Sequence, residues 1–482
     1  MTGDRLKEKT AKGILWGGLN NGVQQLLNLI IGIFLARILT PEDYGLVGVL
    51  AVFSASAAAI QEGGFMSALN NRKTASFEDY NSVFWFSATC GFCFYVALFF
   101  CAPLISRFYE MPELTNLARF IFLGFVFSSL NIVPRALLFR NLKVKESSIA
   151  LIISLFISGV TAICMAAAGF AYWALAVQTV VYTFSNTLIC YFITSWHPRF
   201  SFSITPIKEM IGYSSKIVIT NLFSIFNGNI FAVLLGKFYN AAEVGDFNQA
   251  NKWTSMGYSL ISGTIFNVAQ PSLTKVTGDI ERQKRVFRKM LRLTALVSFP
   301  AMLGLGFVAK DFIVLLITEK WLQSALIMQI LCVWGAFFPI GYLFSNLLLS
   351  QGKSGLFMYS TIFLCLVLIA VVFFSKSLGL HTMLVNYVVV NIAWLFVWFY
   401  LGKRNLPIKL SEVVRDVCPY LFLTVLSLVA TYFATFFILE PVLGLFAKII
   451  IMATIYCGLL WCFKSVIFLE GLRLIRSRLQ KQ

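Results

Sequence analysis

The sequence predicts an all-α polytopic membrane protein with about fourteen transmembrane helices. Hydrophobic residues make up 59% of the chain and charged residues only 12%, whereas a soluble domain carries about 25% charged residues. The mean hydropathy is +0.80. Because a span needs roughly 20 apolar residues, the 482 residues leave no long polar stretch for a soluble domain.

Apolar windows of span length place the expected helices in order along the chain. The eighth is the least apolar, since residues 246–255 are polar. Between the ninth and tenth, the amphipathic segment 309–324 is expected to lie in the membrane interface, with Trp321 as an aromatic anchor. The expected spans are 13–36, 44–66, 82–105, 116–137, 147–169, 172–194, 212–236, 244–270, 290–309, 325–350, 355–375, 379–401, 416–438 and 442–466.

Basic residues predict how the chain crosses the membrane. They gather before the first span, after the last, and in the loops 135–145, 275–292 and 403–415, all on one side if the spans number fourteen. Loops rich in Lys and Arg stay cytoplasmic, so both termini are expected in the cytoplasm. The net charge of +18 is then explained without nucleic acid. No cleavable signal peptide is expected.

Two stretches 200 residues apart resemble each other. Residues 35–45 read LARILTPEDYG and residues 235–245 read LGKFYNAAEVG. Each has a cation at the end of an apolar helix, an acidic turn, and a glycine in the next helix. An internal repeat of this length is typical of half a transporter. We therefore expect a six-helix half over 1–200, a second over 201–405, and two further helices with a basic tail over 406–482.

Polar side chains inside the membrane concentrate in the first two expected helices of each half. Amides and charges there are costly and usually face protein or water. In one interpretation they line a water-filled cavity between the halves, where amides bind sugar hydroxyls and two lysines bind an anion. In the other they are interhelical hydrogen bonds and lysines that reach the interface. The cavity candidates are Asn21, Gln25, Asn28, Lys216, Asn221, Asn227, Asn248 and Lys252.

No catalytic or metal-binding constellation stands out. The ten cysteines fall almost entirely in apolar runs, and His197 and His381 lie near helix ends, so we expect no catalytic residue, no metal and no cofactor. Glu62, followed by two glycines, is a candidate for H⁺ or Na⁺ coupling. A solvated acid at a helix end is the alternative.

A series of short motifs in a fixed order resembles the polysaccharide-export flippases of the multidrug/oligosaccharidyl-lipid/polysaccharide exporter superfamily. Together the motifs span about residues 10–400. They are residues 35–45, Glu62-Gly-Gly-Phe65, Ser82-Val-Phe-Trp85, residues 102–109 with Pro112-Glu-Leu114, Gly236-Lys237 with Val244-Gly245, Gln270-Pro-Ser-Leu273, Phe299-Pro300, Glu319-Lys-Trp321 and Gln351-Gly-Lys-Ser354.

This resemblance implies two pseudo-symmetric six-helix halves, a central cavity and alternating access. The implied activity moves an undecaprenyl-diphosphate-linked oligosaccharide across the bacterial inner membrane, from the cytoplasmic to the periplasmic leaflet, for O-antigen, capsule or exopolysaccharide synthesis. Lys216 and Lys252 are the nearest candidates for binding the diphosphate. Relatives often carry an acid before the Gly-Lys pair, where Asn229 stands here. A polysaccharide polymerase is a candidate partner, and a monomer is the default.

Two other functions compete with flipping. A drug or cation exporter of the same superfamily would favour an acidic or aromatic cavity, whereas the intramembrane charges here are mostly basic. A membrane enzyme such as a polymerase or a lipid-linked glycosyltransferase would need a large external loop or clustered carboxylates, and the sequence contains no acid–base pair of that kind.

Overall fold

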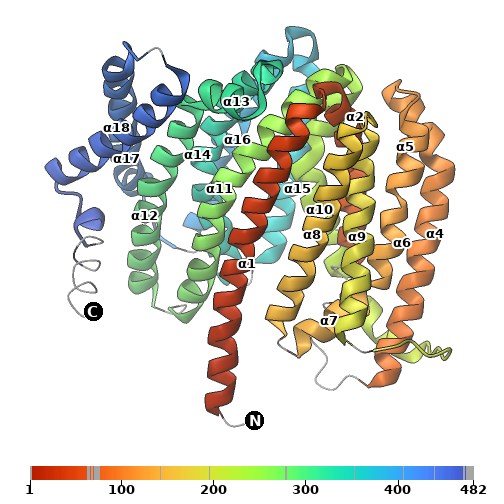
Figure 1. Ribbon diagram of the computed structural model, residues 1–482. Coiled ribbons are helices and arrows are strands. Elements are labelled where there is room, and N and C mark those ends of the chain that lie inside the picture. Colours follow the sequence, from red (N-terminus) through yellow and green to blue (C-terminus); the bar gives the residue numbers. More distant parts are fainter. Residues whose placement is uncertain are drawn as a thin grey trace. The chain divides into compact units, whose positions relative to one another are not determined.

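The computed structural model (Figure 1) consists of helices joined by short connections. It describes residues 3–61, 76–141, 143–194, 196–276, 279–351, 353–404, 406–438 and 440–470, with Met66, Leu69 and Arg473; side chains are not described for 3–19, 57–61, 216–221 and some further positions on α10, α11 and at Ser354. Every regular element in this part of the chain is a helix. The all-α class is therefore confirmed.

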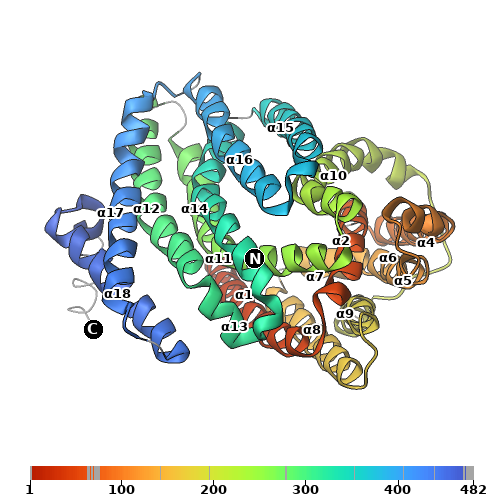
Figure 2. The same cartoon turned by 90° about the horizontal axis from the view of Figure 1, so that it is seen from above.

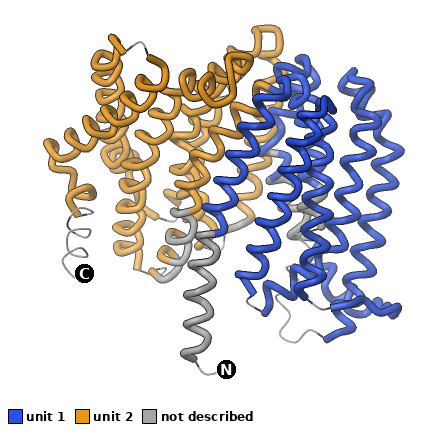
Figure 3. Tube along the Cα trace, viewed as in Figure 1, with its two compact units in different colours: residues 1–245 blue, residues 246–482 orange. Residues whose placement is uncertain are grey.

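The chain divides into two compact units, residues 1–245 and 246–482 (Figure 3). In the first unit, α4, α5, α6, α8 and α9 run side by side (Figure 1). Its helices are α1 (Gly3–Ile38), α2 (Pro41–Gln61), α4 (Phe77–Tyr109), α5 (Leu114–Ile121), α6 (Leu123–Leu130), α7 (Ile132–Arg140), α8 (Val144–Ala167), α9 (Trp173–Thr194) and α10 (Thr205–Phe238), and α11 (Ala241–Lys275) begins there.

Two of the apolar clusters among the described residues show how the first unit is held together. One joins α1 to α8 and α9 around Leu35, Leu155 and Ala174. The other joins α4, α7 and the segment before α10 around Phe84 and Trp196, whose rings lie 5.5 Å apart. Because lipid is as apolar as these side chains, van der Waals packing holds such clusters together inside a bilayer. The clusters fix the helices that carry the polar positions described below.

The segment between α9 and α10, where the boundary between halves is expected, is fastened to α4. The Asn81 amide oxygen accepts a hydrogen bond from the Arg199 backbone N–H at 2.8 Å, and the Asn81 amide nitrogen donates to the Ser201 carbonyl. Trp85 Nε1 donates to the Arg199 carbonyl at 2.8 Å, and Ser82 accepts from the Ser203 N–H. The Ser82–Trp85 motif thus has a structural role. The division of the chain into halves at residue 200 stays a prediction.

The repeated stretches place their glycines against each other. A Cβ atom on Gly45 would lie 1.7 Å from the Ala241 carbonyl oxygen, and one on Gly245 would lie 1.7 Å from the Pro41 carbonyl oxygen. Each first turn therefore packs backbone against backbone on the other, an approach that only glycine permits. This reciprocal contact is a physical reason for the similarity between the two stretches of sequence.

The second unit is built on α12 and α14, which pack along each other (Figure 2). α16 packs on α14, α17 on α12, and α18 on α17. Its helices are α12 (Ile280–Phe307), α13 (Ala309–Ile317), η2 (Glu319–Trp321), α14 (Leu322–Ser350), α15 (Ser354–Ser375), η3 (Lys376–Leu378), α16 (Leu380–Lys403), α17 (Leu410–Thr435) and α18 (Pro441–Cys462).

Ion pairs fasten the last two helices at both ends. The guanidinium of Arg288 on α12 holds both carboxylate oxygens of Asp416 on α17, with its Nε 2.6 Å and its Nη2 3.1 Å away, and its Nη1 lies 3.0 Å from Glu412. Near the other end, Lys448 on α18 pairs with Asp311 on α13 at 2.5 Å. The basic residues expected in the loop 275–292 lie on the first turns of α12, except Lys275, which ends α11, and part of their charge is paired.

Ten of the described helices are long and apolar enough to cross a membrane, and an eleventh span forms if the bent pair 114–130 and 132–140 counts as one. That pair is broken by a 42° bend. The remaining expected spans correspond to α2, α10 and α11, and their crossing of the membrane stays a prediction, as does the total of fourteen. The polytopic class is confirmed.

The prediction that Trp321 anchors the chain in the membrane interface is wrong. Its side chain is fully buried, because the chain turns at Thr318, with φ of 83°, and η2 then packs back on α13 and α14. The amphipathic segment itself is helical as α13, with Ile313 and Ile317 buried.

Candidate functional site

A polar cavity of about 260 Å³ lies in the first unit among α1, α8 and α9. Gln24 and Asn28 line it from α1, one turn apart, while Ser158 comes from α8 and Gln178 and Thr179 from α9; Leu155 and Tyr182 complete it. Gln24 donates a hydrogen bond to Asn20 at 2.8 Å. Among the described residues no partner binds the amides of Asn28 or Gln178. Unpaired amides in a cavity can bind water or ligand hydroxyls.

The spacing of Asn21, Gln25 and Asn28 predicts that they share one face of α1, and this face reaches the cavity only in part. Asn28 lines it, whereas Asn21 is exposed and Gln25 is half-buried, and neither lines it. Sequence reasoning missed Gln178 and Thr179, because it looked for polar residues in the first two expected helices of each half, whereas these two lie on α9. Substrate binding by all of these side chains stays a prediction.

A second polar group lies on α11 in the second unit. Gln249 is only 1% exposed, and neither atom of its amide has a partner among the described residues. The Asn248 amide nitrogen and the Trp253 indole N–H are also buried and unpaired. Leaving buried polar groups unsatisfied costs about 1–3 kcal/mol each. Groups of this kind are expected where water or a ligand completes the hydrogen bonds.

Lys252 lies within this group of polar residues. It is half-buried, and its Nζ lies 5.7 Å from the Trp253 ring. No carboxylate pairs with it in the described part of the chain. The nearby acid Asp246 is buried and accepts a hydrogen bond from Ser324 at 2.7 Å, which joins α11 to α14. An unpaired half-buried cation can attract an anionic group.

Four of the predicted residues fall where side chains are not described. Lys216, Asn221 and Asn227 lie on α10, whose backbone is helical over Thr205–Phe238, but their side chains are outside the description. Glu62 lies outside the described residues altogether. Asn229, which stands where relatives often carry an acid, donates to the Ile225 carbonyl of its own helix at 2.9 Å.

Metal chemistry finds no support in the described residues. No group of three His, Cys, Asp or Glu side chains among them could hold a metal ion. Cys90 and Cys93, spaced as in a redox motif, are both unpaired thiols on α4. What the described sites offer is hydrogen bonding and charge inside apolar helices, which suits binding more than covalent chemistry.

Comparison with known proteins identifies the family. Residues 34–326 match the family described as polysaccharide biosynthesis protein. Among curated proteins, the chain is 26% identical over 358 residues to the lipopolysaccharide biosynthesis protein WzxC of Escherichia coli K12, covering 72% of this chain and 71% of that protein. It is 23% identical over 367 residues to the teichuronic acid biosynthesis protein TuaB of Bacillus subtilis 168, covering 73% and 74%.

Solved structures show the same fold. The lipid II flippase MurJ in an inward closed conformation superposes with a TM-score of 0.77 at 15% identity, over 95% of this chain and all of that one. An inward-facing multidrug resistance transporter of the MATE family superposes with a TM-score of 0.66 at 18% identity, over 80% and 94%. With a family match that spans more than half of its residues, the chain belongs to the polysaccharide biosynthesis protein family.

Proposed function

We propose that this protein is a transporter, not an enzyme, and that it moves undecaprenyl-diphosphate-linked oligosaccharide repeat units from the cytoplasmic to the periplasmic leaflet of a bacterial inner membrane. The observation that carries the proposal is the family match over residues 34–326. The likeness in fold to a lipid II flippase supports it. The glycan would feed O-antigen, capsule or exopolysaccharide synthesis, with polymerase machinery as a partner.

The proposed mechanism is alternating access of a polar, partly cationic central cavity. A sugar headgroup cannot cross hydrocarbon with its hydroxyls unpaired, since each costs several kcal/mol. Unpaired amides such as Asn28, Asn248 and Gln249 supply replacements for water. Lys252, and Lys216 on α10, would hold the diphosphate. Asn21, Gln25, Asn221 and Asn227 are proposed as further sugar contacts.

Orientation and energy coupling complete the proposal. Both termini would be cytoplasmic, because the basic segments then lie on the cytoplasmic side. The halves 1–200 and 201–405 would rock against each other, with 406–482 as an accessory pair of helices.

Glu62 is the candidate for H⁺ or Na⁺ coupling. Glu62→Gln should then abolish the dependence of transport on the ion gradient, and a variant with unchanged gradient dependence would exclude this role.

The decisive experiment sorts lipid-linked glycan by leaflet in a strain that lacks the gene. We expect accumulation on the cytoplasmic side that is relieved when the gene is restored. Normal surface polysaccharide without accumulation would contradict the proposal. A cation exporter would then be the next candidate, given the fold shared with a multidrug transporter.

A further inference from the structure

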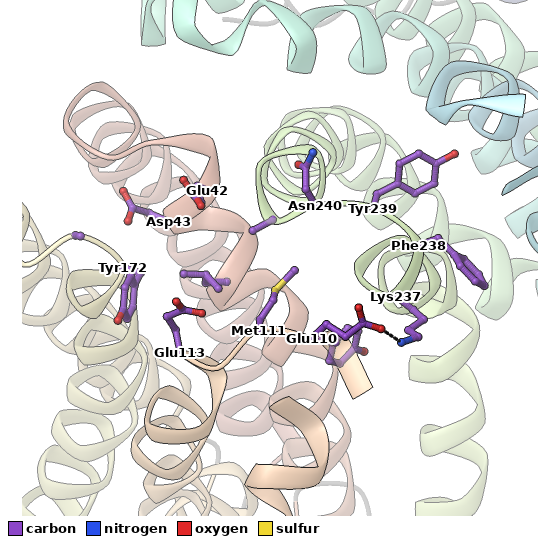
Figure 4. A pocket seen from close by; sticks show the side chains of 14 residues that line it. Glu42, Asp43, Glu110, Met111, Glu113, Tyr172, Lys237, Phe238, Tyr239 and Asn240 are labelled. Carbon is purple, nitrogen blue, oxygen red and sulfur yellow. Dashed lines mark hydrogen bonds and ion pairs between the residues drawn. The ribbon is translucent and has the colours of Figure 1, made fainter. Parts of the chain in front are cut away.

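A larger cavity, of about 620 Å³, opens among the connecting loops of the first unit. Its walls come from four places: the start of α2, the loop between α4 and α5, the loop before α9, and the turn between α10 and α11 (Figure 4). These loops lie at the end of α8 and α9 opposite α7, the helix that carries Arg135 and Arg140 (Figure 1). The volume falls within the ordinary range of about 300–1,000 Å³ for small-molecule sites.

The cavity is lined mainly by acids and tyrosines. Figure 4 shows Glu113 and Tyr172 on one side and Lys237 and Tyr239 on the other. Lys237, the cation of the region, is already occupied: its Nζ lies 2.9 Å from Glu110 and donates to the Phe108 carbonyl at 2.7 Å. The charged side chains that remain in the wall are therefore carboxylates, which accept hydrogen bonds.

Two of the carboxylates form no hydrogen bond or ion pair with the described residues. Glu42 and Glu113 are exposed in the cavity wall, and neither has a hydrogen-bond or ion-pair partner within the described ranges. By contrast, Asp43 accepts hydrogen bonds from the backbone N–H and the hydroxyl of Thr40 and caps α2. Glu42 and Glu113 are thus free to accept hydrogen bonds from a ligand.

An independent observation points to a ligand. Tyr109 lines the cavity and is only 4% exposed, yet its hydroxyl is buried without a partner among the described residues. Its ring packs closely against the backbone of α10 at Gly236, where an added Cβ atom would lie only 3.0 Å from the ring. A buried hydroxyl without a partner is costly unless something completes its hydrogen bonds.

The chemistry selects a hydroxyl-bearing ligand. Carboxylates repel a diphosphate, and no trio of carboxylates among the described residues converges on a metal site. Dispersed acceptors match the several O–H donors of a sugar. Tyrosine adds an amphipathic ring for the apolar face of a pyranose. Asn240, also in the wall, accepts a hydrogen bond from the Glu243 N–H with its amide oxygen and has its amide nitrogen left to donate.

We infer that this cavity binds the sugar residues of the transported glycan at the periplasmic end of the first unit, apart from the diphosphate. The inference rests on the proposed function, because that function supplies both the glycan and the orientation. In this role the cavity holds the leading sugars during release, while the charged linkage is bound elsewhere.

Binding of a defined probe tests the inference. The probe is the oligosaccharide released by mild acid from the lipid-linked carriers that accumulate in the deletion strain. The full-length protein is held in phospholipid nanodiscs, which avoid sugar-based detergents. We expect Tyr109→Phe, and the double variant Glu42→Gln with Glu113→Gln, each to weaken binding on the order of tenfold for each lost hydrogen bond.

Matched controls separate binding from folding. Glu319→Gln removes an exposed carboxylate outside the cavity and should leave affinity unchanged. Tyr109→Phe removes only an unpaired hydroxyl, so its Tm should be equal to or above that of the unaltered protein. Inorganic pyrophosphate should not compete with the probe.

Each remaining outcome overturns a stated claim. Unchanged affinity in both cavity variants, or competition by pyrophosphate that these variants abolish, would refute the sugar site while leaving flipping intact. No binding of the probe to the unaltered protein would refute it as well. Absence of lipid-linked glycan accumulation in the deletion strain would refute the proposed function and, with it, this inference.

Discussion

The two turns at residues 35–45 and 235–245 have the same helix–turn–helix layout, yet the helices that follow them differ within two turns. Each turn leaves two residues between its helices. Each is closed by reciprocal hydrogen bonds, between Asp43 and Thr40 in the first and between Glu243 and Asn240 in the second. The shared part is the part that packs around the two glycines.

Beyond the glycines the two helices diverge in polarity. α2 buries Val49 and Val52, which are 1% and 3% exposed. At the positions 200 residues later, α11 carries Gln249, 1% exposed, and the half-buried Lys252. Close packing therefore preserves the turn in both copies, while the following positions are free to become polar in one of them. This difference favours α11 as the helix that contacts a polar substrate.

The largest effect is expected from filling the contact between the glycines. Gly45→Ala or Gly245→Ala places a methyl group 1.7 Å from a carbonyl oxygen, so the two first turns must separate. Overpacking of this kind typically costs about 1–3 kcal/mol. We expect each variant to lose most translocation in the leaflet assay and to lower Tm.

Glycines without neighbours provide the control for this prediction. A Cβ on Gly22 or Gly228 would meet no atom within 4 Å, and alanine favours a helix over glycine by about 1 kcal/mol. Gly22→Ala and Gly228→Ala should therefore retain activity and stability. If they fail as severely as the Gly45 and Gly245 variants, close approach is not the cause.

The next largest effect is expected from the cation that only α11 carries. If Lys252 holds the diphosphate, Lys252→Ala should lower the translocation rate about tenfold or more, the scale of one charge-assisted hydrogen bond, with normal membrane expression. Lys252→Arg should retain part of the rate. The matched variant Val52→Ala in α2 should reduce stability but not the rate per folded molecule. Full activity of Lys252→Ala would remove this lysine from the site.

The helices and both repeated turns could be predicted from the sequence, because apolar windows and acidic turns are local signals. Long-range contacts could not. The hydrogen bonds of Asn81 to Arg199 and Ser201 join positions more than 100 residues apart, and no local sequence pattern predicts them. The burial of Trp321 depends on a single turn at Thr318, so an interfacial position looked equally reasonable.

The candidate site was predictable to a smaller extent. Asn248 and Lys252 lie four residues apart, on one face of α11. Gln249 lies off that face, and its burial without partners emerges only from packing. On α1, the periodicity grouped Asn28 with Gln25, whereas Gln24 is the residue beside Asn28 in the cavity. Amphipathic periodicity indicates a face, and the neighbouring helices decide which part of it is enclosed.

A smaller effect should distinguish the two pairs of reciprocal hydrogen bonds, Thr40 with Asp43 and Asn240 with Glu243. Asp43 accepts hydrogen bonds from Thr40 at 2.9 and 2.8 Å, whereas Glu243 accepts from the Asn240 N–H at 3.3 Å. Losing a helix cap costs about 1 kcal/mol. We therefore expect Asp43→Ala to lower the free energy of unfolding by about that amount and Glu243→Ala by less, measured by thermal unfolding. Equal losses would show that backbone packing, not the caps, sets both turns.

The smallest effect concerns the cation at the end of the second turn. The hydrogen bond and charge of Lys237 lower the pKa of Glu110 below its usual range. Because this pKa is lower in the folded protein than in the unfolded chain, the pair stabilises the fold at neutral pH, and the contribution disappears as pH falls through the lowered pKa. The Glu110 side chain is 80% exposed, so the effect should be slight and screened by salt.

Lys237→Gln should accordingly lower Tm slightly at pH 7 and low salt, and the difference from the unaltered protein should vanish in strong acid or at high salt. A difference that persists in acid would assign the effect to the hydrogen bond from Lys237 to the Phe108 carbonyl, at 2.7 Å, which does not titrate. In that case the second turn is fastened to the end of α4 through a backbone contact, and the carboxylate of Glu110 is left free for the cavity beside it.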